Sequence, residues 1–338
     1  MDSGIGQKKR IVAGVDRYCV VEPLFEGCRV ILSYRGETYS PAYVQGISGA
    51  AFRIAGICPC APTCSYMMEP QDLLELLGYE AEPLAIYGEG PDPDVHLYEV
   101  LARVKDEVRA GRPVLFWNAF TNCEWDVVCG FDDEGKQLVG RGSYVGHDEY
   151  ALADEARTLT AVARVLIGAI LIGEKRGTFD AREAEVAALK EAVRHAHSTS
   201  NKDKLCGDQW VMLEGLLCYD RWVSDFEADP PKVTNLGDFY CLGVYRSTHQ
   251  AAADFARELV PKYPAAREHL ERAAEQFAAE AKGLNECFEV VFPDGQLTEE
   301  ADPARNARAV DLLSQARECY AGGIDAVERA LRQIDKQF

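Results

Sequence analysis

The hydrophobic pattern of the N-terminal half predicts a mixture of helices and strands. Between Cys19 and Tyr34, apolar residues recur at the three- and four-residue spacing of one helical face. Pro23 is compatible with the first turn of this helix. Two further helices are expected over Gln71–Leu77 and Leu97–Arg109. Four apolar runs have the length and composition of strands: Pro113–Trp117, Trp125–Phe131, Gln137–Val139 and Val165–Ile172.

After Gly177 the pattern is helical, and this change marks a predicted domain boundary. The helical stretches are 181–197, 206–226, 238–263, 265–288 and 303–336. We therefore predict an α+β domain over residues 1–177 and an all-helical domain, arranged as a bundle, over residues 178–338.

Charge and composition narrow the functional classes. The 338 residues carry 55 acidic and 36 basic side chains, and the net charge of -19 argues against nucleic acid or an anionic membrane as the main partner. The longest apolar run, Val165–Ile172, is far shorter than the roughly 20 residues of a membrane span. The N-terminus lacks the apolar core of a secretory signal, so we expect a cytoplasmic protein with reduced cysteines.

One stretch of the chain is strongly acidic. Residues 54–102 hold nine acids and no Lys or Arg. Such a stretch indicates either a solvated face or the flank of a site for a cationic ligand.

Cys19 is the first candidate for chemistry because the predicted helix begins there. The positive end of a helix dipole lowers the pKa of a thiol and so favours the nucleophilic thiolate. The alternative is a small buried apolar side chain, which is what most unpaired cysteines are.

The order of motifs along residues 11–175 resembles a known family. Cys19 and its helix lead into Tyr34-Arg35-Gly36, and Gly111-Arg112-Pro113-Val114 precedes a strand that runs from Glu124 to Asp132. This order resembles the papain-like domains of bacteriocin-processing peptidases. It resembles more closely the N-terminal domain family of butirosin biosynthesis protein H, whose members carry a helical C-terminal portion. The resemblance implies a papain-like α+β fold in which a histidine on the second strand partners the cysteine.

The chain departs from that family at the histidine. Glu124 or Asp126 stands at its position, and a carboxylate beside Cys19 would oppose ionisation of the thiol. His147, followed by Asp148, is the nearest replacement: either a base with its orienting carboxylate or two exposed loop residues. The segment before Cys19 also lacks the Gln or Asn that papain-like enzymes use in the oxyanion hole.

Three further residues are candidates for substrate binding: Arg53, Trp125 and Arg141. Arg53 follows a turn that resembles one flanking the active site in the butirosin-type family, where it binds a carboxylate or is simply solvated. Cys58, Cys60 and Cys64 form the densest cysteine cluster, but this C-x-C-x3-C spacing without a fourth ligand is a poor match to zinc sites. We therefore predict neither a metal nor a cofactor.

Three classes of function remain open. The first is a Cys19-dependent acyltransferase or amide hydrolase that acts on a small amine or peptide. The second is a catalytically degenerate papain-like protein that binds such a ligand without turnover. The third is a scaffold that only docks a partner protein. The sequence leaves open whether the chain forms a homo-oligomer.

Overall fold

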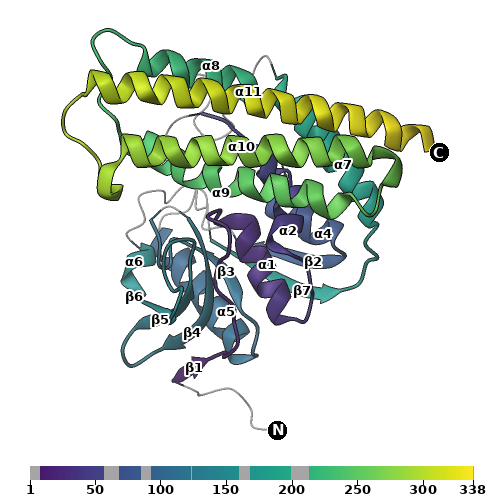
Figure 1. The fold of residues 1–338 in the computed structure, drawn as a ribbon. Coiled ribbons are helices and arrows are strands. Elements are labelled where there is room, and N and C mark those ends of the chain that lie inside the picture. The colour runs from purple at the N-terminus through teal and green to yellow at the C-terminus, as the bar shows by residue number, and fades with distance from the viewer. Residues whose placement is uncertain are drawn as a thin grey trace. The chain divides into compact units, whose positions relative to one another are not determined.

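The computed structural model describes residues 8–56, 68–84, 93–122, 124–159, 168–198 and 213–337 (Figure 1). The chain divides into two compact units. The first comprises Met1–Ser40 and Glu69–Phe179, and the second comprises Pro41–Met68 and Asp180–Phe338. The last crossing between the units, after Phe179, lies close to the boundary predicted after Gly177. Residues 41–68, which the sequence pattern assigns to the first domain, belong to the second unit.

The first unit is built on an antiparallel sheet. Its strands are β1 (Lys9–Ile11), β2 (Tyr79–Leu84), β3 (Val114–Trp117), β4 (Trp125–Asp132), β5 (Gln137–Arg141), β6 (Ala151–Asp154) and β7 (Ala169–Lys175). The strand order is β2-β7-β3-β4-β5-β6, and β1 pairs with β4 off this path. Each of these pairs is antiparallel.

The central strands of this sheet are those that the apolar runs predicted. β3 is buried along its whole length, and β4 is buried from Trp125 to Phe131. β7 contains the described apolar part of the predicted run Val165–Ile172; residues 160–167, which include the start of that run, lie outside the described residues. The sequence did not predict β1, β2 and β6, because these strands have exposed positions and lack a continuous apolar run.

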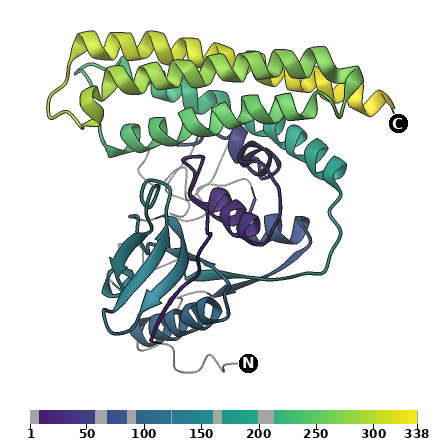
Figure 2. The same cartoon turned by 60° about the horizontal axis from the view of Figure 1, so that its bottom comes forward.

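The described helices of the first unit are α1 (Leu24–Tyr34), α4 (Pro70–Leu76), α5 (Pro93–Arg109) and α6 (Ala156–Leu159). Helices α1 and α5 both pack on β3 and β4. Figure 2 shows them on opposite faces of the sheet, which explains why the central strands are apolar on both faces. The fold is therefore mixed α+β with an antiparallel sheet, as predicted.

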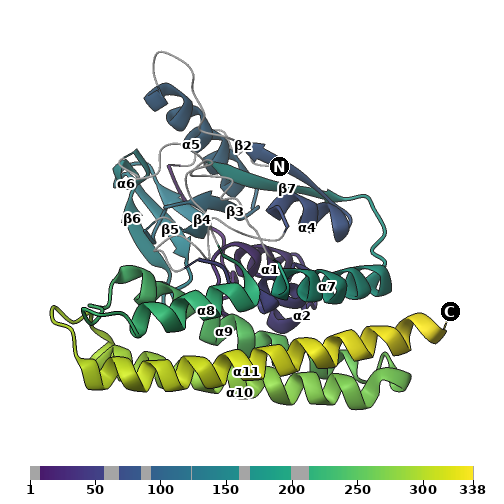
Figure 3. The same cartoon turned by 90° about the horizontal axis from the view of Figure 1, so that it is seen from above.

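The second unit is helical in its described residues. Its helices are α2 (Pro41–Ile47), α7 (Ala181–Ala196), α8 (Gly215–Phe226), α9 (Leu236–Leu259), α10 (Arg267–Val291) and α11 (Pro303–Ile334), with a short 3-10 turn, η1, at Ala50–Phe52. Helix α10 packs along both α9 and α11, and Figures 1 and 3 show these long helices side by side. Each of the five helical stretches predicted after Gly177 contains a helix. No helix in the described ranges is long and apolar enough to cross a membrane.

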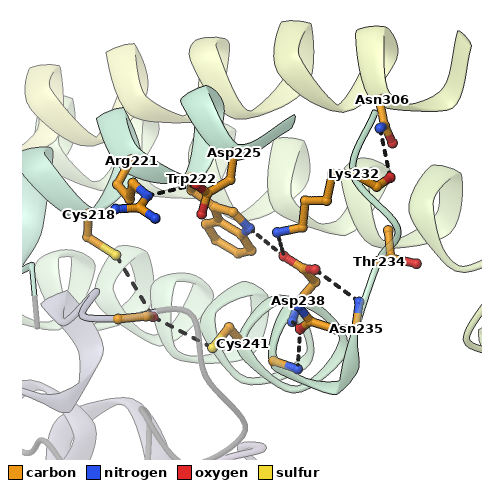
Figure 4. A network of polar contacts seen from close by, with 12 residues as sticks. Cys218, Arg221, Trp222, Asp225, Lys232, Thr234, Asn235, Asp238, Cys241 and Asn306 are labelled. Carbon is orange, nitrogen blue, oxygen red and sulfur yellow. Dashed lines mark hydrogen bonds and ion pairs between the residues drawn. The ribbon is translucent and has the colours of Figure 1, made fainter. Parts of the chain in front are cut away.

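A buried carboxylate, Asp238, ties the connection between α8 and α9 to the bundle (Figure 4). It accepts hydrogen bonds from Trp222 Nε1 at 3.0 Å, from Lys232 Nζ at 2.7 Å and from the Asn235 amide at 3.1 Å. Asn306, on α11, donates to the carbonyl of Lys232 at 2.9 Å. Because a buried charge is tolerated only when it is paired and hydrogen-bonded, this network fixes the loop in one conformation.

Candidate functional site

Cys19 lies before helix α1 and not in its first turn, so the prediction that this thiol opens the helix is wrong. The residue before a proline is disfavoured in the helical region, and Glu22 precedes Pro23. The helix therefore starts at Leu24, and the carboxylate of Glu22 accepts the first-turn amides of Leu24, Phe25 and Glu26 at 2.9, 2.8 and 3.0 Å. The positive end of the helix thus stabilises Glu22 rather than a thiolate.

The thiol of Cys19 is exposed and has charged neighbours from its own stretch of chain. The Cys19 amide donates to Glu26 Oε1 at 2.8 Å, and Arg29 Nη2 lies 3.9 Å from the sulfur. Neighbouring atoms still shield the sulfur from part of the solvent, and this partial desolvation raises the pKa of the thiol above its ordinary value. The charge of Arg29 opposes the shift, and the charges of Glu26 and Asp16 add to it. At neutral pH the Cys19 thiol is consequently less ionised than an ordinary cysteine.

Glu26 holds this segment in place from inside the unit. Its carboxylate is fully buried and pairs with Arg29 at 2.7 Å. Burial raises the pKa of Glu26, and the hydrogen bond and charge of Arg29 counteract that shift. The pair therefore serves to position the loop that carries Cys19.

Asp126, one of the two carboxylates at the expected histidine position, is fully buried in β4. It accepts hydrogen bonds from the Phe120 amide at 2.7 Å, from the Thr121 amide at 3.0 Å and from Thr121 Oγ1 at 2.7 Å. Burial raises the pKa of Asp126 to about 6, although these three donors oppose the shift. Its oxygens are thus committed to the turn that leads into β4.

Glu124, the other carboxylate, is also buried and accepts a hydrogen bond from the hydroxyl of Ser143. Trp125 is buried as well, and its ring meets that of Trp117 edge-on at 5.7 Å between centroids. The carbonyl of Trp125 accepts a hydrogen bond from Tyr18 Oη at 3.1 Å. The structure therefore brings the segment around Cys19 to the start of β4 through Tyr18, and no histidine of the described residues is among the contacts given for this junction.

The remaining predicted residues have different surroundings. His147 and Asp148 are exposed in the loop between β5 and β6. Arg141 is half-buried: its guanidinium lies 4.1 Å from the centroid of the Tyr150 ring and donates to the carbonyls of Val15 and Gly146. Arg53 is buried in the second unit. Arg141 thus contacts the backbone of two loops, and the alternative that Arg53 is a solvated side chain is wrong; the substrate contacts expected of both residues stay predictions.

A groove of about 840 Å³ lies in the first unit, beside β2, β7 and the ends of α4 and α5. The sequence did not predict this groove. Its charged side chains are predominantly acidic: Glu75, Glu80, Glu82, Glu107 and Glu174 face only two bases, Arg112 and Arg176. Ala81, Leu171 and Ile172 also line the groove, although Leu171 and Ile172 are largely buried.

The ion pairs of the groove leave part of its negative charge uncompensated. Arg112 pairs with Glu107, and Arg176 pairs with Glu80 at 3.1 Å. The exposed carboxylates of Glu75 and Glu174 form no ion pair with any residue that the structure describes. A cation that enters the groove would therefore meet two accessible carboxylates that are not held in a direct ion pair, although Arg112 and Arg35 weaken the negative potential at Glu174.

Metal-ligating side chains do not gather elsewhere in the described ranges. No group of three or more His, Cys, Asp or Glu side chains among the described residues is placed to hold a metal ion. Cys58, Cys60 and Cys64 lie outside these residues.

Comparison with known proteins adds no further assignment. No family model matches the sequence, and no curated protein matches it significantly. The likeness to the butirosin-type family therefore rests on the motifs themselves.

Proposed function

We propose that the first unit is a papain-like binding protein that holds a cationic small molecule or a basic peptide without turnover. The acidic groove beside β2 and β7 is the observation that carries this proposal. Helix α1 packed against an antiparallel sheet, with the segment of Cys19 beside the start of β4, supports a papain-like scaffold.

The surroundings of Cys19 favour binding over catalysis. The amides of the first helical turn already bind Glu22, so they are not available to stabilise a thiolate. Burial raises the pKa of the thiol, and the carboxylates that replace the family's histidine are buried and hydrogen-bonded. A Cys-dependent enzyme needs a thiolate and a base within reach of it, and these features supply neither.

The chemistry of the groove selects the ligand class. Glu75 and Glu174 attract a positive charge, while the half-buried Ala81 offers a small apolar surface to the alkyl part of an amine or of a lysine or arginine side chain. A polyamine or a short basic peptide combines these two properties.

Calorimetric titration with spermine tests the proposal. The Glu75→Gln/Glu174→Gln double variant removes the two carboxylates that lack an ion pair, and it should weaken spermine binding by about tenfold. Glu149→Gln, which removes one exposed acid outside the groove lining, is the control and should bind like the wild type. Added salt should weaken binding to the wild type. Equal affinity of the double variant and the wild type would show that the groove is not the site.

A further inference from the structure

An internal segment, Phe52–Gly56, runs through the second unit, and side chains of the surrounding helices bind its backbone. We call these five residues the strap. Tyr320 Oη donates to the carbonyl of Phe52 at 2.9 Å, and Tyr245 Oη bonds both the amide and the carbonyl of Ala55, at 3.1 and 2.7 Å.

The end of the strap is bound as well. The Gly56 amide donates to the carbonyl of Leu213 at 3.0 Å. The thiols of Cys218 and Cys241 approach the Gly56 carbonyl at 3.9 and 3.7 Å, and Figure 4 shows both cysteines.

Two buried histidines bind the middle of the strap, and their pKa values are shifted in opposite directions. His249 Nε2 donates to the Arg53 carbonyl at 2.9 Å, and its Nδ1 lies 2.6 Å from Glu280 Oε1. Burial alone would lower the pKa of His249, but the charge of Glu280 and its hydrogen bond raise it above the ordinary value. Glu280 thus favours the cationic form of His249, while burial, together with the charge of Arg53, puts the pKa of His195 well below its ordinary value.

An uncharged His195 matches the amide that it faces. The Ile54 N–H donates to His195 Nε2 at 3.1 Å. Among the described residues, this nitrogen is the acceptor for that N–H group. The Ile54 carbonyl, 3.0 Å from the same nitrogen, also accepts the Gly215 amide at 2.8 Å. A proton on Nε2 would therefore keep a bond to the Ile54 carbonyl but leave the buried Ile54 N–H facing another donor.

We propose that the strap is an acid-sensitive latch, closed while His195 is uncharged and loosened over Ile54–Gly56 when this ring takes up a proton. Phe52 stays anchored because its ring packs on those of Phe255 and Phe277, at 6.0 and 5.5 Å between centroids. The chain enters the second unit at Pro41 and leaves it after Met68, so the latch lies on a segment that connects the two units covalently.

The charges around His195 make protonation in the closed state unfavourable. Arg53 on the strap, Arg194 on α7 and His249 on α9 all lower the pKa of His195. Glu214, before α8, is the opposing charge, with its Oε2 3.6 Å from His195 Nδ1. Burial raises the pKa of Glu214, so the closed state holds a proton on this carboxylate more tightly than an opened state does, and the titration of Glu214 opposes that of His195. The other titratable groups of the cluster are Glu280, Cys218, Tyr219, Tyr245 and Tyr320.

The direction of the pH dependence follows from the lowered pKa. An opened His195 regains its ordinary pKa of about 6.5, so opening takes up a proton below that pH and takes up none above it. Through His195 the equilibrium constant for opening should therefore rise about tenfold for each pH unit below about 6.5, until the pH reaches the pKa of His195 in the closed state or the raised pKa of Glu214, below which Glu214 flattens the slope.

Hydrogen exchange read by mass spectrometry over the peptide that contains Ile54–Gly56 tests the latch, after correction for intrinsic exchange rates. The wild type should lose protection at these amides about tenfold per pH unit below about 6.5, while the amides of α10 keep theirs. His195→Gln retains an acceptor for Ile54 but cannot titrate, so its protection should not change with pH. His197→Gln, an exposed histidine beside the same helix, should behave like the wild type.

Protection that does not depend on pH in the wild type would overturn the latch, and so would a wild-type pH dependence in His195→Gln. Loss of α10 protection in parallel with the strap would also contradict it, because that would be global unfolding. The wild-type measurements are decisive on their own if His195→Gln does not fold.

Discussion

Asp238 in the second unit and Asp126 in the first are both fully buried, but their hydrogen-bond partners differ in charge. Asp238 meets the ammonium of Lys232 as well as two neutral donors, whereas Asp126 is hydrogen-bonded by two amides and a hydroxyl. Glu185, also buried in the second unit, again meets a lysine, Lys262. The second unit therefore neutralises these buried acids internally, while Asp126 remains in a site that favours the neutral acid.

The same contrast extends to the surface of the first unit. Among the described side chains, Glu75 and Glu174 of the groove form no direct ion pair, although the charge of Glu174 acts on Arg112 and Arg35. Negative charge that a unit does not neutralise by its own side chains is available to a ligand. This is why we assign ligand binding to the groove and a structural role to the carboxylates of the helical unit.

The largest effect is expected from Asp238→Ala. The substitution leaves the ammonium of Lys232 and the indole N–H of Trp222 without their acceptor, and it should lower the free energy of unfolding by about 3–5 kcal/mol. Urea denaturation measures this change. Asp225→Ala, which removes the more exposed ion pair with Arg221, is the control and should cost at most about 1 kcal/mol. Similar losses in the two variants would refute the special role of Asp238.

Asp126→Asn is expected to change the pH dependence of stability. The pKa of Asp126 rises from an ordinary 3.8 to about 6, so the folded state binds this proton more tightly than the unfolded chain does. The protonated Asp126 therefore contributes most to the free energy of unfolding below about pH 4. This contribution falls as the pH rises to about 6, by about 3 kcal/mol in total. An asparagine does not titrate, but its amide can accept the Phe120 and Thr121 N–H groups and donate to Thr121 Oγ1.

The difference in unfolding free energy between wild type and Asp126→Asn, followed by urea denaturation from pH 4 to 7, should therefore move in favour of the variant as the pH rises. Asp148→Asn, at an exposed position, controls for loss of one charge and should show no such trend. Parallel curves for wild type and Asp126→Asn would rule out a buried neutral acid.

The central strands could be predicted because a strand that is buried on both faces has a continuous run of apolar residues. The long helices could be predicted because a helix that is buried on one face has apolar residues every three or four positions. The start of α1 predicted from the sequence is wrong. Apolar residues continue at helical spacing back to Cys19, but Glu22 precedes Pro23 and is disfavoured in the helical conformation, so the helix begins only at Leu24. Residues 41–56 could not be assigned to the helical unit, because a short buried segment carries no mark of which unit buries it.

The candidate site was predictable in part. The acidic stretch 54–102 contains Glu75, Glu80 and Glu82, which line the groove, and a site for a cationic ligand was one of the two interpretations of its charge, the other being a solvated face. Glu174 could not be included, because only the pairing of β2 with β7 brings it beside them. The latch could not be predicted from the sequence for a similar reason. His195 and His249 lie far from the strap in the sequence, and only the fold brings both of them to its backbone.

The central claim, that the first unit binds a cation in the groove without turnover, is tested most directly by mapping where spermine binds. Amide chemical shifts of the 15N-labelled protein report the position, and mass spectrometry of the recovered spermine, after incubation with and without acyl donors, reports turnover. The account predicts shifts at Gly78, Gly173 and Gly177, which line the groove, and unmodified spermine. Shifts centred on Cys19 and Val20, together with an acylated amine that disappears in Cys19→Ala, would contradict it and establish the enzyme instead.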